Sequence, residues 1–161
     1  MKQNISVVIV AGGRGTRMKS DTPKQYMVLG GKTVAEHSFD LFLEMAEVKE
    51  VVVVCAEEYR PFFERKGCNK RIAFAEPGAR RQDSVYSGLC ELNSEETLVC
   101  VHDAARPCIE ETGVRAVFAA ADECGAAFLG LPSKYTLKQC DEDGVVVQTL
   151  DRSVVWEAQT P

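Results

Sequence analysis

A glycine-rich stretch with four cations follows the first apolar run of the chain. Residues 5–10 (ISVVIV) are apolar and mostly β-branched, and the glycines Gly12, Gly13 and Gly15 follow them almost directly. Glycine lets a backbone approach a ligand closely and adopt φ angles that are closed to other residues. The nearby cations are Arg14, Arg17, Lys19 and Lys24. A strand that leads into bare amide groups and cations is suited to holding a polyphosphate.

Two well-known phosphate-binding motifs do not fit this stretch. It lacks the Gly-Lys-Ser/Thr of a P-loop, and Met18 stands where a dinucleotide-binding fingerprint needs its third glycine. A tight turn with solvated cations is the simplest alternative. The order of a glycine turn, Arg17, a spacer and then Pro23-Lys24 resembles the nucleotidyltransferase signature instead.

Two further polar groups follow later apolar runs, at residues 78–84 (GARRQDS) and 102–107 (HDAARP). Ligands of an open α/β sheet bind beyond the carboxyl ends of its strands, so we expect both groups to face one cleft. Mg²⁺ takes one or two carboxylates together with phosphate oxygens, which makes Asp103 a candidate ligand. The alternative for Asp103 is a helix N-cap or an ion pair with Arg106.

Apolar runs alternate with helical patterns through most of the chain. We expect strands at 5–10, 50–55, 71–75, 97–102 and 126–131, and helices at 33–46, 61–65, 80–92 and 110–123. This alternation predicts an α/β fold with a parallel sheet covered on both faces. Without an internal repeat or linker, residues 1–161 are expected to form a single domain.

The pattern changes after residue 134. Segments 135–139 and 145–149 flank an Asp-Gly pair at 143–144, which predicts a β-hairpin. A two-stranded hairpin is marginal alone in water and has little to pack against in a three-layer domain. We therefore expect 134–150 to be an arm that reaches a second subunit in a homodimer. The alternative is a hairpin folded back on its own sheet.

Composition argues against several classes of function. The net charge of −5 does not suit a general nucleic-acid surface. No apolar run approaches the roughly 18 residues that a membrane span needs. Seven cysteines without a Cys-x-x-Cys pair, and only two histidines, do not predict a zinc site. The odd count and the lack of a signal peptide fit a reducing cytoplasm, and Cys55, Cys90 and Cys100 are expected to be buried.

Four separated motifs together resemble the 2-C-methyl-D-erythritol 4-phosphate cytidylyltransferase family. They are residues 23–26 (PKQY), 81–85 (RQDSV), 102–107 (HDAARP) and 149–152 (TLDR), and the resemblance runs from Ile5 to Pro161. It implies a Rossmann-like three-layer sandwich of the nucleotide-diphospho-sugar transferase type, with a dimerising β-arm. It also implies transfer of a cytidylyl group from CTP to a sugar-alcohol phosphate, methylerythritol phosphate, with Mg²⁺, in isoprenoid precursor synthesis.

The resemblance also implies roles for individual residues. Arg17, Lys24 and Arg152 match catalytic positions, and Asp103 matches a position that serves both metal and nucleotide. Nucleotide contacts are implied for Ala11, Gly12, Gly13, Gly15, Gly78, Arg81 and Ser84. Arg106, Thr136 and Arg152 match positions that hold methylerythritol phosphate, partly across the dimer.

One departure concerns the end of the chain. The family continues for some tens of residues beyond 159–161, with a further catalytic lysine and a substrate-binding segment. We therefore expect a fragment with a complete nucleotide half and an incomplete acceptor half. Two alternatives stay open: a cytidylyltransferase for another polyol phosphate, such as ribitol 5-phosphate, and a non-catalytic nucleotide-binding subunit.

Overall fold

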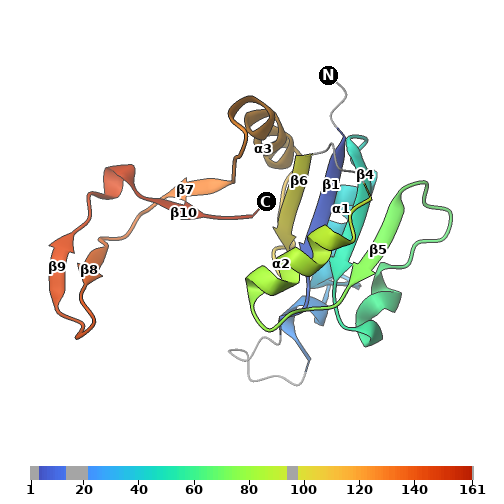
Figure 1. Cartoon of the computed structure of the whole chain (residues 1–161), viewed down its shortest axis with the longest axis horizontal. Coiled ribbons are helices and arrows are strands. Elements are labelled where there is room, and N and C mark those ends of the chain that lie inside the picture. Colours follow the sequence, from blue (N-terminus) through green and yellow to red (C-terminus); the bar gives the residue numbers. More distant parts are fainter. Residues whose placement is uncertain (1–3, 14–21, 94–97, 161) are drawn as a thin grey trace.

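The computed structural model describes residues 4–13, 22–93 and 98–160 (Figure 1). Its centre is a four-stranded parallel sheet with the strand order β5-β4-β1-β6. The strands are β1 (Ile5–Val10), β4 (Val48–Val54), β5 (Arg71–Ala75) and β6 (Leu98–Asp103). The parallel α/β sheet predicted from the alternating pattern is confirmed.

Helices cover both faces of this sheet. Helices α1 (Val34–Glu44) and α3 (Glu111–Cys124) pack on one face, and α2 (Arg81–Cys90) packs on the other, as Figure 1 shows for α1 and α2. Strand side chains alternate between the faces, so Val7 joins the core under α1 and α3 while Val8 lies under α2. A Cβ on Gly88 of α2 would lie 2.5 Å from Val8 Cγ1, so glycine there lets the helix pack tightly.

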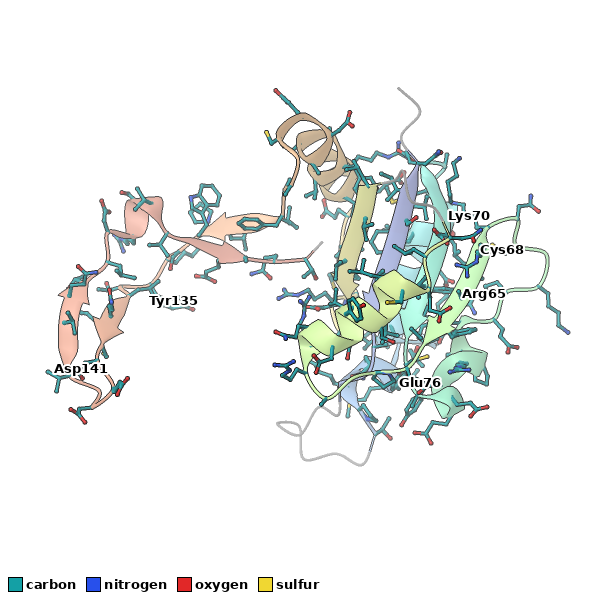
Figure 2. All side chains as sticks on the ribbon, viewed as in Figure 1. Arg65, Cys68, Lys70, Glu76, Tyr135 and Asp141 are labelled. Carbon is teal, nitrogen blue, oxygen red and sulfur yellow. The ribbon has the colours of Figure 1, made fainter. Side chains whose placement is uncertain are left out.

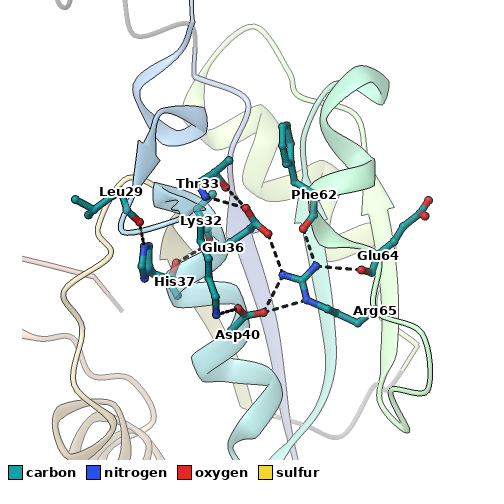
Figure 3. A network of polar contacts seen from close by, with 11 residues as sticks. Leu29, Lys32, Thr33, Glu36, His37, Asp40, Phe62, Glu64 and Arg65 are labelled. Carbon is teal, nitrogen blue, oxygen red and sulfur yellow. Dashed lines mark hydrogen bonds and ion pairs between the residues drawn. The ribbon is translucent and has the colours of Figure 1, made fainter.

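The first turn of α1 is stabilised by a local cap and by a distant arginine. Thr33 donates its backbone N–H and hydroxyl to Glu36, which forms a capping box. Arg65 donates from Nε and Nη2 to Asp40 Oδ1, at 3.1 and 2.9 Å, and from Nη2 to Glu36 Oε1 at 3.2 Å (Figure 3). These bonds fasten the 3₁₀ helix η3 (Glu57–Phe63), which ends just before Arg65, to α1.

Three short elements lie within residues 22–33, the described segment directly before α1. The 3₁₀ helix η2 spans Lys24–Tyr26, and strands β2 (Val28–Leu29) and β3 (Lys32–Thr33) pair antiparallel. Gly30 and Gly31 take φ angles of 60° and 89° at the turn between β2 and β3, a conformation that favours glycine.

Residues 130–158 project from the body as an arm (Figure 1). Strands β7 (Gly130–Pro132) and β10 (Trp156–Ala158) form an antiparallel ribbon, and the hairpin of β8 (Lys138–Cys140) and β9 (Val146–Thr149) lies at its far end. The 3₁₀ helix η4 (Arg152–Val154) joins β9 to β10. The predicted hairpin is thus confirmed, and it is not folded back on the four-stranded sheet.

Three sequence-based expectations are wrong. The apolar run 126–131 is not a fifth parallel strand, because only its end enters β7, which pairs antiparallel with β10. The short helix expected at 61–65 is the 3₁₀ helix η3, which begins four residues earlier. Cys55 and Cys100 are buried, but Cys90 is exposed, because Ser84 and Gly88 occupy the sheet-facing side of α2 at helical spacing.

None of the helices of the described residues combines the length and apolarity needed to cross a bilayer.

Candidate functional site

The polar segments meet at the carboxyl edge of the sheet. Strands β1 and β6 are neighbours, with Val10 opposite Asp103, so the glycine turn and the HDAARP segment begin side by side. The Ala104 backbone N–H donates to Val10 O at 3.1 Å and holds the two segments together. The shared edge predicted for these motifs is therefore observed.

The described start of the glycine turn is tied to η2. Gln25 Nε2 donates to Ala11 O and to Gly13 O, both at 2.6 Å, and the Tyr26 hydroxyl donates to Ala11 O at 3.0 Å. Burial raises the pKa of Tyr26, and nearby Cys55 adds to the shift, so this hydroxyl remains a proton donor. Lys24 precedes Gln25 directly and is exposed at the same edge.

Gly15 and Arg17 lie outside the described residues.

Gly12 and Gly78 allow close approaches that a side chain would prevent. A Cβ on Gly12 would lie 2.2 Å from Pro77 Cβ, and one on Gly78 would lie 2.4 Å from Asp83 Cβ. The loops that follow β1 and β5 therefore pack directly on each other. This packing brings Gly78 close to the glycine turn although β4 separates the two strands.

Ser84 fixes the loop that precedes α2. Its hydroxyl accepts a hydrogen bond from the Gly78 backbone N–H at 3.0 Å and donates to Arg80 O at 3.3 Å. Asp83 binds the Arg80 guanidinium and its backbone N–H, which lowers the pKa of the carboxyl. The predicted base-contact residues Gly78, Arg81 and Ser84 thus lie together at the start of α2.

Asp103 is held between two arginines. Arg81 donates from Nε and Nη2 to Asp103 Oδ1, at 3.1 and 2.7 Å, and Arg106 Nε lies 3.7 Å from Oδ2. The Asp103 side chain is 32% exposed, so one carboxylate edge remains accessible to a ligand. The ion pair with Arg106 that we considered as an alternative role for Asp103 is present, alongside the contact with Arg81.

Asp103 suits Mg²⁺ only together with ligands from outside the protein. Over residues 4–13, 22–93 and 98–160, no group of three or more His, Cys, Asp or Glu side chains is placed to hold a metal. Magnesium commonly binds one or two carboxylates and completes its shell with phosphate oxygens and water. A single accessible carboxylate beside the glycine turn fits that requirement.

His102 belongs to the core rather than to the site's exposed surface. It is fully buried, its ring meets the Phe42 ring edge-on at 5.4 Å, and Nδ1 lies 3.4 Å from Thr160 Oγ1. Burial lowers the pKa of His102 to about 4, so the imidazole is neutral near pH 7.

Thr136 and Arg152 are not brought to this edge by their own chain. Thr136 is exposed on the arm before β8, and Arg152 is exposed in η4. Arg106 is the one predicted acceptor residue in contact with Asp103 among those described. It also borders a groove of about 500 Å³ beside α3, whose lining, including Ile109, Val114 and Leu129, is mainly apolar and does not suit a sugar phosphate.

Comparison with known proteins gives consistent matches. A family model described as 2-C-methyl-D-erythritol 4-phosphate cytidylyltransferase matches residues 5–161. A protein of that name, marked chloroplastic, from Oryza sativa subsp. japonica is 48% identical over 99% of this chain. The protein of that name from Haemophilus influenzae (strain PittGG) is 36% identical over the whole chain.

The chain belongs to this family. It spans 54% of the length of the rice cytidylyltransferase and 71% of the Haemophilus one. Among solved structures, the 4-diphosphocytidyl-2C-methyl-D-erythritol synthase from Anaerococcus prevotii superposes with a TM-score of 0.84 at 26% identity, covering 100% of this chain and 70% of that one. The cytidylyltransferase from Thermus thermophilus gives 0.72 at 31% identity, covering 99% and 69%. The Rossmann-like α/β fold implied by the resemblance is confirmed.

For this cytidylyltransferase-family chain, sequence reasoning missed two sets of contacts. Gln25 and Tyr26 were recognised only as part of a motif, although two polar residues directly after Pro-Lys could have suggested an anchor for the turn. The Asp103 backbone N–H donates to Thr160 Oγ1 at 3.2 Å, and Arg106 Nη1 donates to Gln159 Oε1. These contacts join residues more than fifty positions apart, and no local pattern signals them.

Proposed function

We propose that this chain binds CTP at the carboxyl edge of its sheet and transfers the cytidylyl group to 2-C-methyl-D-erythritol 4-phosphate, releasing pyrophosphate. The observation that carries the proposal is the Arg81–Asp103–Arg106 cluster directly beside the glycine turn. Membership of the cytidylyltransferase family supports the reaction and its place in isoprenoid precursor synthesis.

The chemistry follows from charge. The acceptor phosphate and the α-phosphate of CTP are both anionic, so repulsion between them and charge build-up at the α-phosphorus dominate the barrier. Fixed cations address this directly, and no protein nucleophile is required. In the proposal Lys24 and Arg17 stabilise the transition state, and the backbone at Ala11, Gly12, Gly13 and Gly15 receives the phosphates.

Asp103 would hold the divalent cation, Mg²⁺, which supplies additional positive charge at the phosphates when bound. The chain's own contribution is to hold that carboxylate in a fixed orientation, through the two hydrogen bonds from Arg81 and the nearby Arg106.

Base recognition is assigned to the loop before α2. Gly78, Arg81 and Ser84 are grouped there, and backbone amide edges in such a loop can distinguish the exocyclic groups of cytosine from those of a purine. The close packing of Gly12 on Pro77 places this loop next to the phosphate-binding turn, as one nucleotide would require.

The arm is assigned to a homodimer, in which Thr136 and Arg152 reach the partner's acceptor site. Its hairpin and the segment that follows expose many apolar side chains; Tyr135 projects from the ribbon in Figure 2 and is 72% exposed. The other large apolar side chains of the arm above half exposure are Leu131, Val145, Val146, Val147, Val154 and Trp156. Replacing Val146 by Asp should shift the mass measured by light scattering from dimer to monomer, whereas replacing exposed Asn69 by Asp should not.

The proposal also places the protein in a reducing compartment, which the sequence leads us to expect is the cytoplasm. All seven cysteines are unpaired, which fits a reducing environment. The rice relative's name says chloroplastic, so imaging of the tagged protein in its source cell decides the compartment.

Pyrophosphate release from CTP tests the reaction. Because the chain spans 54% of the rice relative, the assay uses this chain joined to the residues that follow the matched region in that protein. We expect turnover with methylerythritol phosphate to exceed turnover with ribitol 5-phosphate by at least about tenfold. Equal or better turnover with ribitol 5-phosphate would contradict the proposed acceptor, and CTP binding without turnover on either would favour a non-catalytic subunit.

A further inference from the structure

We propose that Gln25 is a positioning residue that turns the backbone of the glycine-rich loop toward the nucleotide phosphates and fixes Lys24 beside it. The inference rests on the proposed function. Gln25 is 4% exposed, and its side-chain nitrogen lies 2.6 Å from both Ala11 O and Gly13 O. A glutamine amide carries two N–H donors, so this pair of bonds uses the donor capacity of the side chain completely.

The bonds determine which way the turn presents its polar groups. In a planar trans peptide the N–H points opposite to the C=O of the same unit. Ala11 O is turned toward Gln25 Nε2 and the Tyr26 hydroxyl, so the Gly12 N–H points to the opposite side. Released from Gln25, the carbonyl oxygens of Ala11 and Gly13 could rotate toward an anionic ligand and repel it.

The same bonds fix Lys24 relative to the turn. Lys24 and Gln25 are consecutive in η2, where Met27 N–H donates to Lys24 O at 3.3 Å. The Tyr26 ring stacks on Tyr59 of η3, with ring centroids 3.7 Å apart and planes within 6°. This leaves η2 clamped between η3 and the glycine turn.

The clamp is itself anchored. Arg65, two residues after the end of η3, binds Asp40 and Glu36 of α1, as Figure 3 shows. Gln25 therefore connects a rigid support to a glycine-rich backbone that has little conformational preference of its own. A residue in this place controls the phosphate end of the nucleotide and leaves the base end, at the loop before α2, unaffected.

The test compares CTP with cytidine, which lacks the phosphates. Both ligands are titrated by NMR into the parent chain and into Gln25→Met, which keeps the side-chain length and removes both donors. We expect Gln25→Met to weaken CTP binding about tenfold and cytidine binding less than twofold. Asn69→Asp and Asn69→Met serve as exposed controls for altering an amide, and both should leave the two affinities unchanged.

Tyr26→Phe is the second variant, in case Gln25→Met does not fold by circular dichroism. It removes one of the two donors to Ala11 O and keeps the ring stack, and it should weaken CTP about threefold with cytidine unchanged. If both variants keep the parent's ratio of CTP affinity to cytidine affinity, the positioning role of Gln25 is refuted and the proposed function is not. A folded parent chain that binds no CTP would overturn the proposed function, and this inference with it.

Discussion

Replacing Gly12 by alanine should damage the site through a clash that the structure defines. The added Cβ would lie 2.2 Å from Pro77 Cβ, 3.1 Å from its Cγ and 3.4 Å from its Cα. Non-bonded carbons approach to about 3.5 Å, so the glycine turn and the loop carrying Pro77 must separate by about 1 Å or more. A misplacement of that size at a reacting centre can cost about a hundredfold in rate, equivalent to about 2.7 kcal/mol of barrier.

The adjacent glycine supplies the matched control. A Cβ on Gly13 would meet none of the described residues within 4 Å, so Gly13→Ala adds the same methyl group without the clash. The quantity to measure is kcat/KM for CTP in the extended enzyme, with the free energy of unfolding determined alongside. We expect Gly12→Ala to lose at least about thirtyfold more than Gly13→Ala. Equal losses in the two variants would refute the argument that contact with Pro77 sets the geometry of the turn.

Three further predictions concern charge. Lys24→Ala should lower kcat by about a hundredfold or more, because it removes a charge-assisted contact to the transition state. Lys66→Ala removes an exposed lysine elsewhere and should leave kcat unchanged. A Lys24→Ala variant with kcat within about threefold of the parent would remove Lys24 from the mechanism. Arg152→Ala should raise KM for the acceptor much more than KM for CTP, and the reverse would reassign Arg152 to the nucleotide. Burial alone would raise the pKa of Glu50, but hydrogen bonds from a hydroxyl, a backbone N–H and a guanidinium outweigh it, so the pKa in the folded protein is lowered. The Glu50 carboxylate therefore binds a proton more readily in the unfolded chain than in the folded protein. Below about pH 4.5 the free energy of unfolding should therefore fall more steeply in the parent than in Glu50→Gln, as urea titrations would show; parallel pH profiles would contradict this.

The sequence was sufficient to predict the four strands of the parallel sheet because their signals are local. Runs such as 50–55 (EVVVVC) identify buried parallel strands without reference to the rest of the chain, and the general rule for α/β sheets then brings Gly12 and Asp103 to one edge. The Asp-Gly pair at 143–144 likewise predicts its turn, where Gly144 has a φ of 81°.

The errors and omissions concern pairing between distant segments. The run 126–131 has the apolarity of a parallel strand, but its end pairs with Trp156–Ala158, and only the folded chain shows that partner. Gln25 contacts Ala11 and Gly13 because the loop places two carbonyl oxygens within reach of one side-chain amide. That placement depends on the geometry of the loop, which the residue pattern does not reveal. The exposure of Cys90 depends on which side of α2 faces the sheet.

Calorimetric titration of this chain with CTP in the presence of Mg²⁺ tests the central claim most directly. A nucleotide site built from the glycine turn, the loop before α2 and Asp103 predicts saturable heat at one site per chain. It also predicts affinity for CTP at least about tenfold above that for ATP. The absence of CTP binding, or equal affinity for the two nucleotides, would contradict the account.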